Sequence, residues 1–222
     1  VKNEKYRKNH VDLIIAAEDR LLREAPHLLA NSETLLADLE QAHRGLALRS
    51  RAAVISHGVP DEAAMEPTGQ SGDTIRILFV GRMELRKGAD VLLEALPGIM
   101  ERHADVEAEF IGDDDILVEG KTLKDAFLER HAGAAWLDRV VFRGFVPNEE
   151  RDRALASCDI FVAPSRYESF GLIFLEAMRY GKPSVGASVG GISEVIEDGK
   201  TGFLPPPGDS DGVTRALEQL IT

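Results

Sequence analysis

From residue 75 to residue 221, stretches typical of β-strands alternate with stretches typical of helices, and this alternation constrains the fold more than any other feature. The first stretch, IRILFVG (75–81), is a nearly continuous apolar run, as expected of a parallel strand covered on both faces. The next, 88–103, repeats apolar residues at helical spacing. Such alternation predicts an α/β fold, a Rossmann-like doubly wound parallel sheet with helices on both faces.

The alternation predicts six strands and six helices in this part of the chain. The strands are expected at 75–81, 107–112, 139–144, 159–165, 183–188 and 202–206. The helices are expected at 88–103, 122–133, 149–158, 172–181, 193–199 and 210–221. Ligands of such sheets bind at the carboxyl ends of the strands, where the strand order reverses. The loops that follow the strands are therefore the places to look for chemistry.

The first 60 residues have a different pattern. They predict a helix at 12–25, a short strand at 27–32, a helix at about 33–43 with Asn31 or Ser32 as its N-cap, and a strand at 52–60. The polar stretch that follows is rich in Gly, Pro and Ser and indicates a linker at 61–74. We therefore expect three parts: residues 1–60, the linker 61–74, and a domain at 75–222.

Charge and composition exclude several classes of function. The net charge of −12 argues against a nucleic-acid-binding surface. The single cysteine, Cys158, cannot form a disulfide within the chain, and its apolar surroundings indicate a core residue rather than a nucleophile. No apolar run reaches the roughly 18 residues of a membrane span, and residues 1–10 lack the apolar segment of a signal peptide. We expect a cytoplasmic protein.

The loop GRMELRKG (81–88) follows the first strand of the alternating region and carries two cations of interest, Arg82 and Lys87. A guanidinium can bind phosphate oxygens in bidentate fashion, and an ammonium adds a point charge. The loop therefore suits a diphosphate, although an exposed basic turn with Arg86 and Lys87 in solvent is the alternative. It matches neither a P-loop nor the dinucleotide-binding G-x-G-x-x-G pattern.

The loop in PSRYESFGLIFLEAMRYGKP (164–183) lies between a strand and a helix. The amides near the start of that helix are suited to bind phosphate, and Gly171 removes a side chain that would block close approach. Glu168 precedes the helix, and Glu176 lies within it. Glu176 could accept hydrogen bonds from sugar hydroxyls; the alternatives are that Glu168 caps the helix and that Glu176 is a solvated helix residue.

Several weaker features have plain structural explanations. Gly190 and Gly191 predict a turn with Ser193 as the N-cap of the next helix, and a phosphate- or sugar-facing role for this turn is the weaker interpretation. The acidic run GDDD (112–115) is expected to be solvated, so no metal site is predicted. His57 is expected to be a turn histidine. His103 and His131 are expected at the ends of helices, and Trp136 is expected to be a packing residue.

Taken together, these motifs resemble glycosyltransferase family four, the glycosyl transferases group one, which are retaining enzymes with the GT-B fold. The resemblance covers 75–221 and rests on GRMELRKG, VVFRGFVPNEE, CDIFVAPSRYESFGLIFLEAM and GKPSVGASVGGISEVIEDGKTGFL. Glu168 and Glu176, with seven residues between them, match the glutamate motif of the family. Asp114 departs from the family pattern, which often has glycine there, and Ser56 stands where proline is expected.

The resemblance implies a role for each matching residue. It implies that Arg82 and Lys87 bind the donor diphosphate and help it to leave, that Glu176 holds the ribose hydroxyls, and that Glu168 contacts the donor sugar. It also implies that the base of the nucleotide contacts the backbone of Val146. Phosphate or sugar would bind near the start of the helix, at Ser169, Phe170, Gly171 and Leu172. The substrate would be a UDP-, GDP- or ADP-sugar, transferred with retention and without a metal or other cofactor.

Residues 1–60 resemble the end of the N-terminal, acceptor-binding domain of the family, through LLANSETLLADL and VISHGVP. The first strand, glycine-rich loop and acceptor-side histidine of that domain are not found in this sequence. The expected partner is therefore the rest of the N-terminal domain, and the isolated chain is expected to bind nucleotide but to transfer little sugar. The acceptor, whether glycan, lipid or small molecule, is left open, as is membrane association of the full-length enzyme. A GT-B sugar-nucleotide epimerase and a degenerate binding module are the alternative functions.

Overall fold

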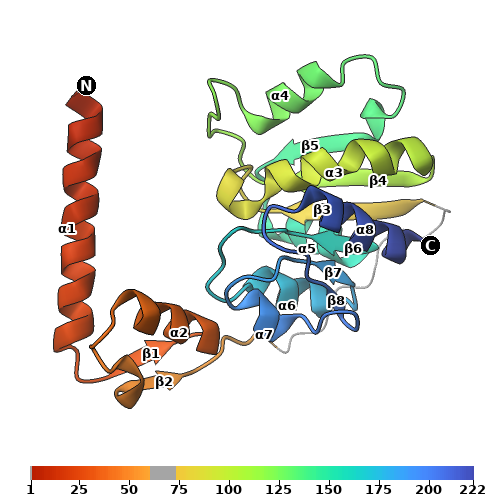
Figure 1. Cartoon of the computed structure of the whole chain (residues 1–222). Helices are drawn as coiled ribbons and strands as arrows, with labels where there is room; N and C mark the ends of the chain where they lie inside the picture. The colour runs from red at the N-terminus through yellow and green to blue at the C-terminus, as the bar shows by residue number, and fades with distance from the viewer. Residues whose placement is uncertain (1, 61–73) are drawn as a thin grey trace. The chain divides into compact units, whose positions relative to one another are not determined.

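The computed structural model describes residues 2–60 and 74–222, with side chains from residue 11 onward. The chain divides into two compact units, Val1–His57 and Gly58–Thr222, each described here by itself (Figure 1). Apart from residue 74, the predicted linker 61–74 lies outside the described residues.

The first unit contains helix α1 (Lys2–Glu24), strand β1 (Leu28–Ala30), helix α2 (Glu33–Ala42), the short 3₁₀ helix η1 (Leu48–Ser50) and strand β2 (Ala52–Val54). The two strands pair in parallel. The Ser32 hydroxyl accepts a hydrogen bond from the Leu35 amide at 3.0 Å, so Ser32 rather than Asn31 caps α2. The predicted start of the first helix at residue 12 was wrong, because the charged residues before it extend the helix without adding apolar periodicity.

The first unit has a small core and leaves many apolar side chains exposed. Among its described residues, the buried apolar side chains are those of Ala30, Leu36 and Leu48. Large apolar side chains that are more than half exposed include Val11, Leu13, Ile14, Ile15, Leu21, Leu29 and Ile55. Among the described side chains, the core of this unit brings together the pair of strands, α2, η1, the end of α1 at Leu22, and Leu46.

The second unit contains the doubly wound parallel sheet that the sequence predicts. Its strands are β3 (Ile75–Val80), β4 (Val106–Ile111), β5 (Val140–Gly144), β6 (Ile160–Val162), β7 (Ser184–Val185) and β8 (Gly202–Phe203). The order across the six-stranded sheet is β5-β4-β3-β6-β7-β8, and every neighbouring pair is parallel (Figure 1). The predicted α/β fold class and the six strands are confirmed.

The helices between these strands are α3 (Ala89–Arg102), α4 (Leu123–Arg130), α5 (Asn148–Ser157), α6 (Leu172–Met178), α7 (Ile192–Val195) and α8 (Ser210–Ile221). Two further 3₁₀ helices, η2 (Leu85–Lys87) and η3 (Leu137–Arg139), precede α3 and β5. Within the described residues, no helix is both long enough and apolar enough to cross a membrane.

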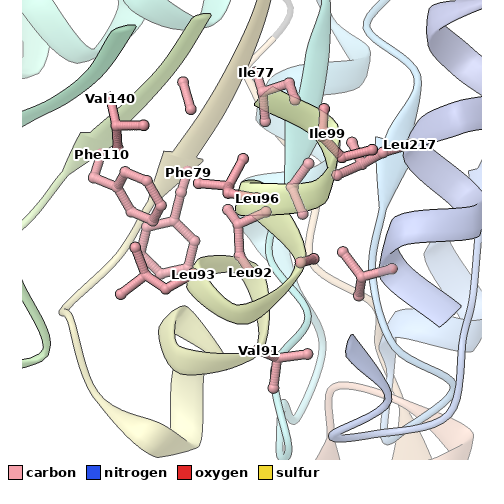
Figure 2. Packing of buried hydrophobic residues seen from close by; sticks show 14 of the residues in the cluster. Ile77, Phe79, Val91, Leu92, Leu93, Leu96, Ile99, Phe110, Val140 and Leu217 are labelled. Atoms are coloured by element: carbon pink, nitrogen blue, oxygen red, sulfur yellow. The ribbon is translucent and has the colours of Figure 1, made fainter. Parts of the chain in front are cut away.

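Each face of the sheet has its own core. Alternation along β3 sends Ile77 and Phe79 to one face, where they pack with α3 and Leu217 of α8 (Figure 2). Leu78 belongs to the core of the opposite face, which includes Phe174 of α6. A strand that is buried on both faces needs apolar residues at successive positions, which explains the continuous apolar run that begins at residue 75.

Several predicted elements are shorter in the structure. The predicted strands 159–165, 183–188 and 202–206 are paired over two or three residues, and the predicted helices 172–181 and 193–199 become Leu172–Met178 and Ile192–Val195. Burial continues past the paired residues, for example at Ala187, which is fully buried just after β7. An apolar run in the sequence therefore indicates that its residues are buried. The length of a strand depends instead on how many of its residues pair with a neighbouring strand.

The strand order reverses beside β3. From β3 the chain proceeds to β4 and β5 on one side of the sheet, and then returns to β6, β7 and β8 on the other. The carboxyl end of β3 leads into the loop 81–88, and that of β6 leads into the loop 164–171. Because β3 and β6 are paired neighbours, the two loops leave the same edge of the sheet at the reversal point, where doubly wound sheets bind ligands.

Candidate functional site

Lys87 and Glu168 meet at the reversal point of the sheet. The Lys87 ammonium donates a hydrogen bond to Glu168 Oε2, with Nζ and Oε2 2.6 Å apart. The two side chains are 25% and 17% exposed, so the ion pair is largely shielded from water. The structure thus brings together one predicted residue from each loop, although 81 residues separate them in the sequence.

The backbones of the two loops also touch. Gly88 is the N-cap of α3 and has the left-handed conformation, with φ of 71°. A Cβ atom added at Gly88 would lie 2.0 Å from the Pro164 carbonyl oxygen, so only glycine allows this approach. Two residues further along the second loop, the Arg166 amide donates to the Arg86 carbonyl at 2.8 Å. These contacts fix the distance between the two backbone segments that carry the Lys87 and Glu168 side chains.

Arg82, the other predicted cation, is exposed on the first loop. Its side chain is 55% exposed, and its Nη2 atom donates to Glu84 Oε1 at 3.2 Å. Arg86 donates to the same Glu84 oxygen at 2.8 Å. Glu84 is 12% exposed and so anchors both guanidinium groups beside the loop. The sequence interpretation missed Glu84, because the acidic residue of a basic loop has no distinctive spacing.

The second loop places the other predicted residues around the start of α6. Ser169 is half-buried, Phe170 and Gly171 are buried, and Leu172 is exposed as the first helical residue. Gly171 is the N-cap with φ of 96°, so the alternative that Glu168 caps this helix is wrong. The backbone N–H groups of a first helical turn lack partners within the helix. Helix α6 begins four residues after Glu168, so these groups lie at the end of the second loop.

The glycine pair at 190–191 packs against the backbone of the second loop. The Gly191 amide donates to the Glu168 carbonyl at 3.1 Å. A Cβ atom added at Gly190 would lie 1.9 Å from that same oxygen. The prediction that Ser193 caps the following helix was wrong, because α7 begins at Ile192 with Gly191 as its N-cap and without a side-chain cap.

Glu176 lies inside α6 and its side chain is 28% exposed, so it is half-buried rather than fully solvated. Its Oε2 atom is buried and accepts no hydrogen bond within the part of the chain that the structure describes. Burial raises the pKa of Glu176, while the positive charge of Arg151 lowers it. The Arg151 guanidinium is 3.8 Å from Oε2, which is close enough for an ion pair but too long for a hydrogen bond.

Val146 and Arg166 complete the carboxyl edge of the sheet. Val146 follows β5 and is 8% exposed, within the core that contains Phe174. Arg166 forms a bidentate pair with Asp90, with distances of 2.7 and 2.6 Å between nitrogen and oxygen. The sequence interpretation missed this pair, because its partners lie 76 residues apart.

The residues expected to be structural have structural surroundings. Cys158 is buried, and burial raises the pKa of its thiol to about 12, which leaves almost no thiolate at neutral pH. Trp136 is buried beside His131 and Phe127. His103 follows α3 and contacts Glu218, with Nε2 and Oε2 2.8 Å apart. These observations confirm the predictions for Cys158 and Trp136 as packing residues and for the two histidines at helix ends.

His57 belongs to the first unit, and the acidic run 112–115 belongs to the second. His57 is exposed, and its Nε2 atom lies 3.4 Å from the Asn31 amide nitrogen. Asp114 Oδ1 is buried without a hydrogen-bond partner among the residues described. In the same part of the chain, no group of three or more His, Cys, Asp or Glu side chains is placed to hold a metal ion.

Comparison with known proteins identifies relatives of this arrangement. The family model described as glycosyl transferases group 1 matches residues 74–222. An uncharacterized glycosyltransferase of Methanocaldococcus jannaschii is 34% identical over 154 residues, which are 69% of this chain and 37% of the relative. The phosphatidyl-myo-inositol mannosyltransferase of Mycobacterium leprae is 34% identical over 191 residues, 84% of this chain and 48% of the relative.

A solved structure gives the same result in three dimensions. The crystal structure of Anabaena HepE in complex with UDP and glucose matches with a TM-score of 0.72 at 26% identity, covering 90% of this chain and 55% of HepE. This chain therefore spans about half the length of the proteins that it matches over most of its own length.

Proposed function

Since this chain belongs to the glycosyl transferases group 1 family and shares the fold of GT-B glycosyltransferases, we propose that it binds the nucleotide diphosphate of a sugar donor. The observation that carries the proposal is the meeting of Lys87 and Glu168 at 2.6 Å, at the reversal point of the sheet. The site would lie at the carboxyl edge, between the loops 81–88 and 164–171.

Positive charge at this edge would stabilise the leaving group. When the bond between the anomeric carbon and the diphosphate oxygen breaks, negative charge grows on the diphosphate. Lys87 and Arg82 would neutralise that charge, and the amides near Phe170, Gly171 and Leu172 would add hydrogen bonds. A charge supplied by fixed side chains makes transfer independent of a metal ion in this proposal. The anomeric configuration would be retained, as the resemblance to family four implies.

Glu168 has two partners in this proposal. In the absence of donor it binds Lys87, and with donor bound it would contact the sugar while Lys87 turns to the diphosphate. Because the pair is 17–25% exposed, its separation is favourable when the diphosphate replaces the lost charge interaction. Glu168 would then help to place the anomeric carbon near the acceptor.

Glu176 would bind the ribose. Its buried Oε2 atom accepts no hydrogen bond from the described residues and can take one from a ribose hydroxyl. A buried carboxylate oxygen without a donor is costly, so a hydroxyl at this position would relieve a cost that is present in the empty site. The base would extend toward Val146 and contact its backbone.

The nucleotide to test first is UDP. HepE, which is 26% identical to this chain, was solved in complex with UDP and glucose. UDP-, GDP- and ADP-sugars all remain candidates, because the diphosphate and ribose contacts above are common to the three. Because the chain spans about half the length of its relatives, we propose that it binds donor and transfers little sugar by itself.

Alanine variants test the diphosphate assignment. Replacing Lys87 or Arg82 by alanine should weaken UDP binding about ten- to a hundredfold, since a charge-assisted hydrogen bond contributes about 1.5–3 kcal/mol. The control is K200A, because Lys200 is exposed, pairs with Glu197, and precedes β8 at the opposite edge of the sheet. Isothermal titration calorimetry gives the three affinities. Unchanged affinity in both K87A and R82A would overturn the assignment.

A further inference from the structure

Arg166 connects the two loops of the site through its side chain. Its Nη1 and Nη2 atoms donate to the two carboxylate oxygens of Asp90 at 2.7 and 2.6 Å. Nη1 also donates to the Leu85 carbonyl at 2.6 Å. Arg166 stands two residues before Glu168, and its partners stand on either side of Lys87. One guanidinium thus joins the segment that carries Glu168 to the segment that carries Lys87.

The strength of these contacts comes from their bidentate hydrogen-bond geometry, because the side chains are only partly buried. The Arg166 and Asp90 side chains are 38% and 25% exposed, and an isolated surface ion pair contributes little. A bidentate pair with a further hydrogen bond to a backbone carbonyl fixes orientation as well as distance. Because Nη1 and Nη2 both donate to protein acceptors, Arg166 differs from Arg82, whose more exposed guanidinium contacts Glu84 on its own loop.

Backbone contacts continue the same connection. The Arg166 amide donates to the Arg86 carbonyl at 2.8 Å, and Gly88 packs against the Pro164 carbonyl. A change in the direction of either loop would therefore have to break the Arg166–Asp90 pair or move α3, whose first turn carries Asp90. Loop position and side-chain pairing are thus coupled.

We propose that Arg166 is a positioning residue, and that its contacts with Asp90 and the Leu85 carbonyl hold the two loops so that Lys87 and Glu168 face the same diphosphate sugar. The proposal rests on the function proposed above and adds a residue that does not touch the donor. We call Arg166, Asp90 and the Leu85 carbonyl the loop latch. Arg166 acts through Lys87 and Glu168 rather than by binding phosphate itself.

The first test needs no ligand. The variant R166M keeps much of the length of the side chain and removes its guanidinium donors, while the backbone amide of residue 166 is unchanged. Hydrogen exchange of the whole chain should become faster in 81–88 and 164–171, with the strands unchanged. The matched control is R102M, which removes another arginine–carboxylate contact between elements, from Arg102 of α3 to Glu218 of α8. Exchange in the two loops that is the same in R166M as in the wild type would overturn the loop latch.

The second test separates positioning from direct binding. R166M should weaken UDP binding about three- to tenfold in the wild-type background and should cause no further loss in K87A. UDP carries no sugar for Glu168 to contact, so the latch affects UDP binding through Lys87 alone. R102M should leave the affinity unchanged in both backgrounds. Equal losses in the two backgrounds would show that Arg166 binds the nucleotide itself and would refute the positioning role. If the wild type binds no nucleotide diphosphate, the proposed function fails, and hydrogen exchange still decides whether the latch exists.

Discussion

At the scale of single residues, Glu176 shows how binding and stability oppose each other. Burial raises its pKa above the ordinary value of 4.5, so folding disfavours its charged form. The nearby Arg151 offsets part of this effect, and no hydrogen bond from the described residues satisfies Oε2. The contribution of a group with a raised pKa is present below its unfolded pKa and is lost as the pH rises through the folded pKa. Ionised Glu176 therefore destabilises the empty protein near neutral pH.

The variant E176Q tests this opposition. Near pH 7 it should unfold at higher denaturant concentration than the wild type, because it removes a buried charge, and the difference should disappear below about pH 4, where both side chains are neutral. Its affinity for UDP should fall at the same time. Urea unfolding between about pH 3 and pH 8, followed by calorimetry, measures both. A variant that is less stable than the wild type at pH 7 would contradict the assigned cost of burial.

The residues of the site differ in how far the sequence predicts them. Lys87 and Glu168 follow from the positions of their loops and from the family resemblance, and the structure places them in contact. Arg166 and Asp90 could not be found in this way, because a pair that lies 76 residues apart leaves no local pattern. The predicted cap at Ser193 was wrong because local propensity was overridden by the contact of Gly191 with the Glu168 carbonyl.

At the scale of elements, the loops are held by close backbone contacts that only glycine allows. Gly190 has φ of 53° and packs against the Glu168 carbonyl, so a side chain there would displace the backbone of the second loop at Glu168. The sequence shows the glycine pair but not what it touches. The contact of this pair with Glu168 is known only from the structure, which places the turn before α7 next to the loop before α6.

The variants G190A and G181A separate the cost of conformation from that of contact. Gly181 also has a positive φ, of 67°, but an added Cβ meets no atom within 4 Å. G181A should therefore lower the free energy of unfolding by about 1–2 kcal/mol, the cost of left-handed backbone, and leave UDP binding unchanged. G190A should cost more and should weaken UDP binding. Equal losses of stability, with equal affinities, would contradict the support assigned to Gly190.

The bounds of the elements follow the sequence well where periodicity is strong. Helix α8 has the predicted bounds, and α3 differs by one residue at each end, because both present a long apolar stripe to the core. The strands β7 and β8 are much shorter than predicted. The run of β7 continues into buried residues such as Ala187, and that of β8 continues into the partly buried Leu204 and Pro205. Periodicity does not distinguish a buried or partly buried loop from a strand.

At the scale of the whole molecule, the alternation of strands and helices predicts a parallel sheet, and the structure adds the order of its strands. That order, β5-β4-β3-β6-β7-β8, places the reversal between β3 and β6 and so selects two loops from all those at the carboxyl edge. The division into the units Val1–His57 and Gly58–Thr222 assigns every residue of this site to the second unit. Nucleotide binding by the isolated chain is therefore a direct test of the proposed site.

Calorimetric titration of the whole chain with UDP, and then with GDP and ADP, tests the central claim most directly. The titrations are done first with a chelator and then with magnesium. The account predicts that one of the three nucleotides binds with one-to-one stoichiometry and micromolar affinity without metal, and that K87A loses most of this affinity. If a chain that circular dichroism shows to be folded binds none of the three under either condition, the loops 81–88 and 164–171 do not form a donor site.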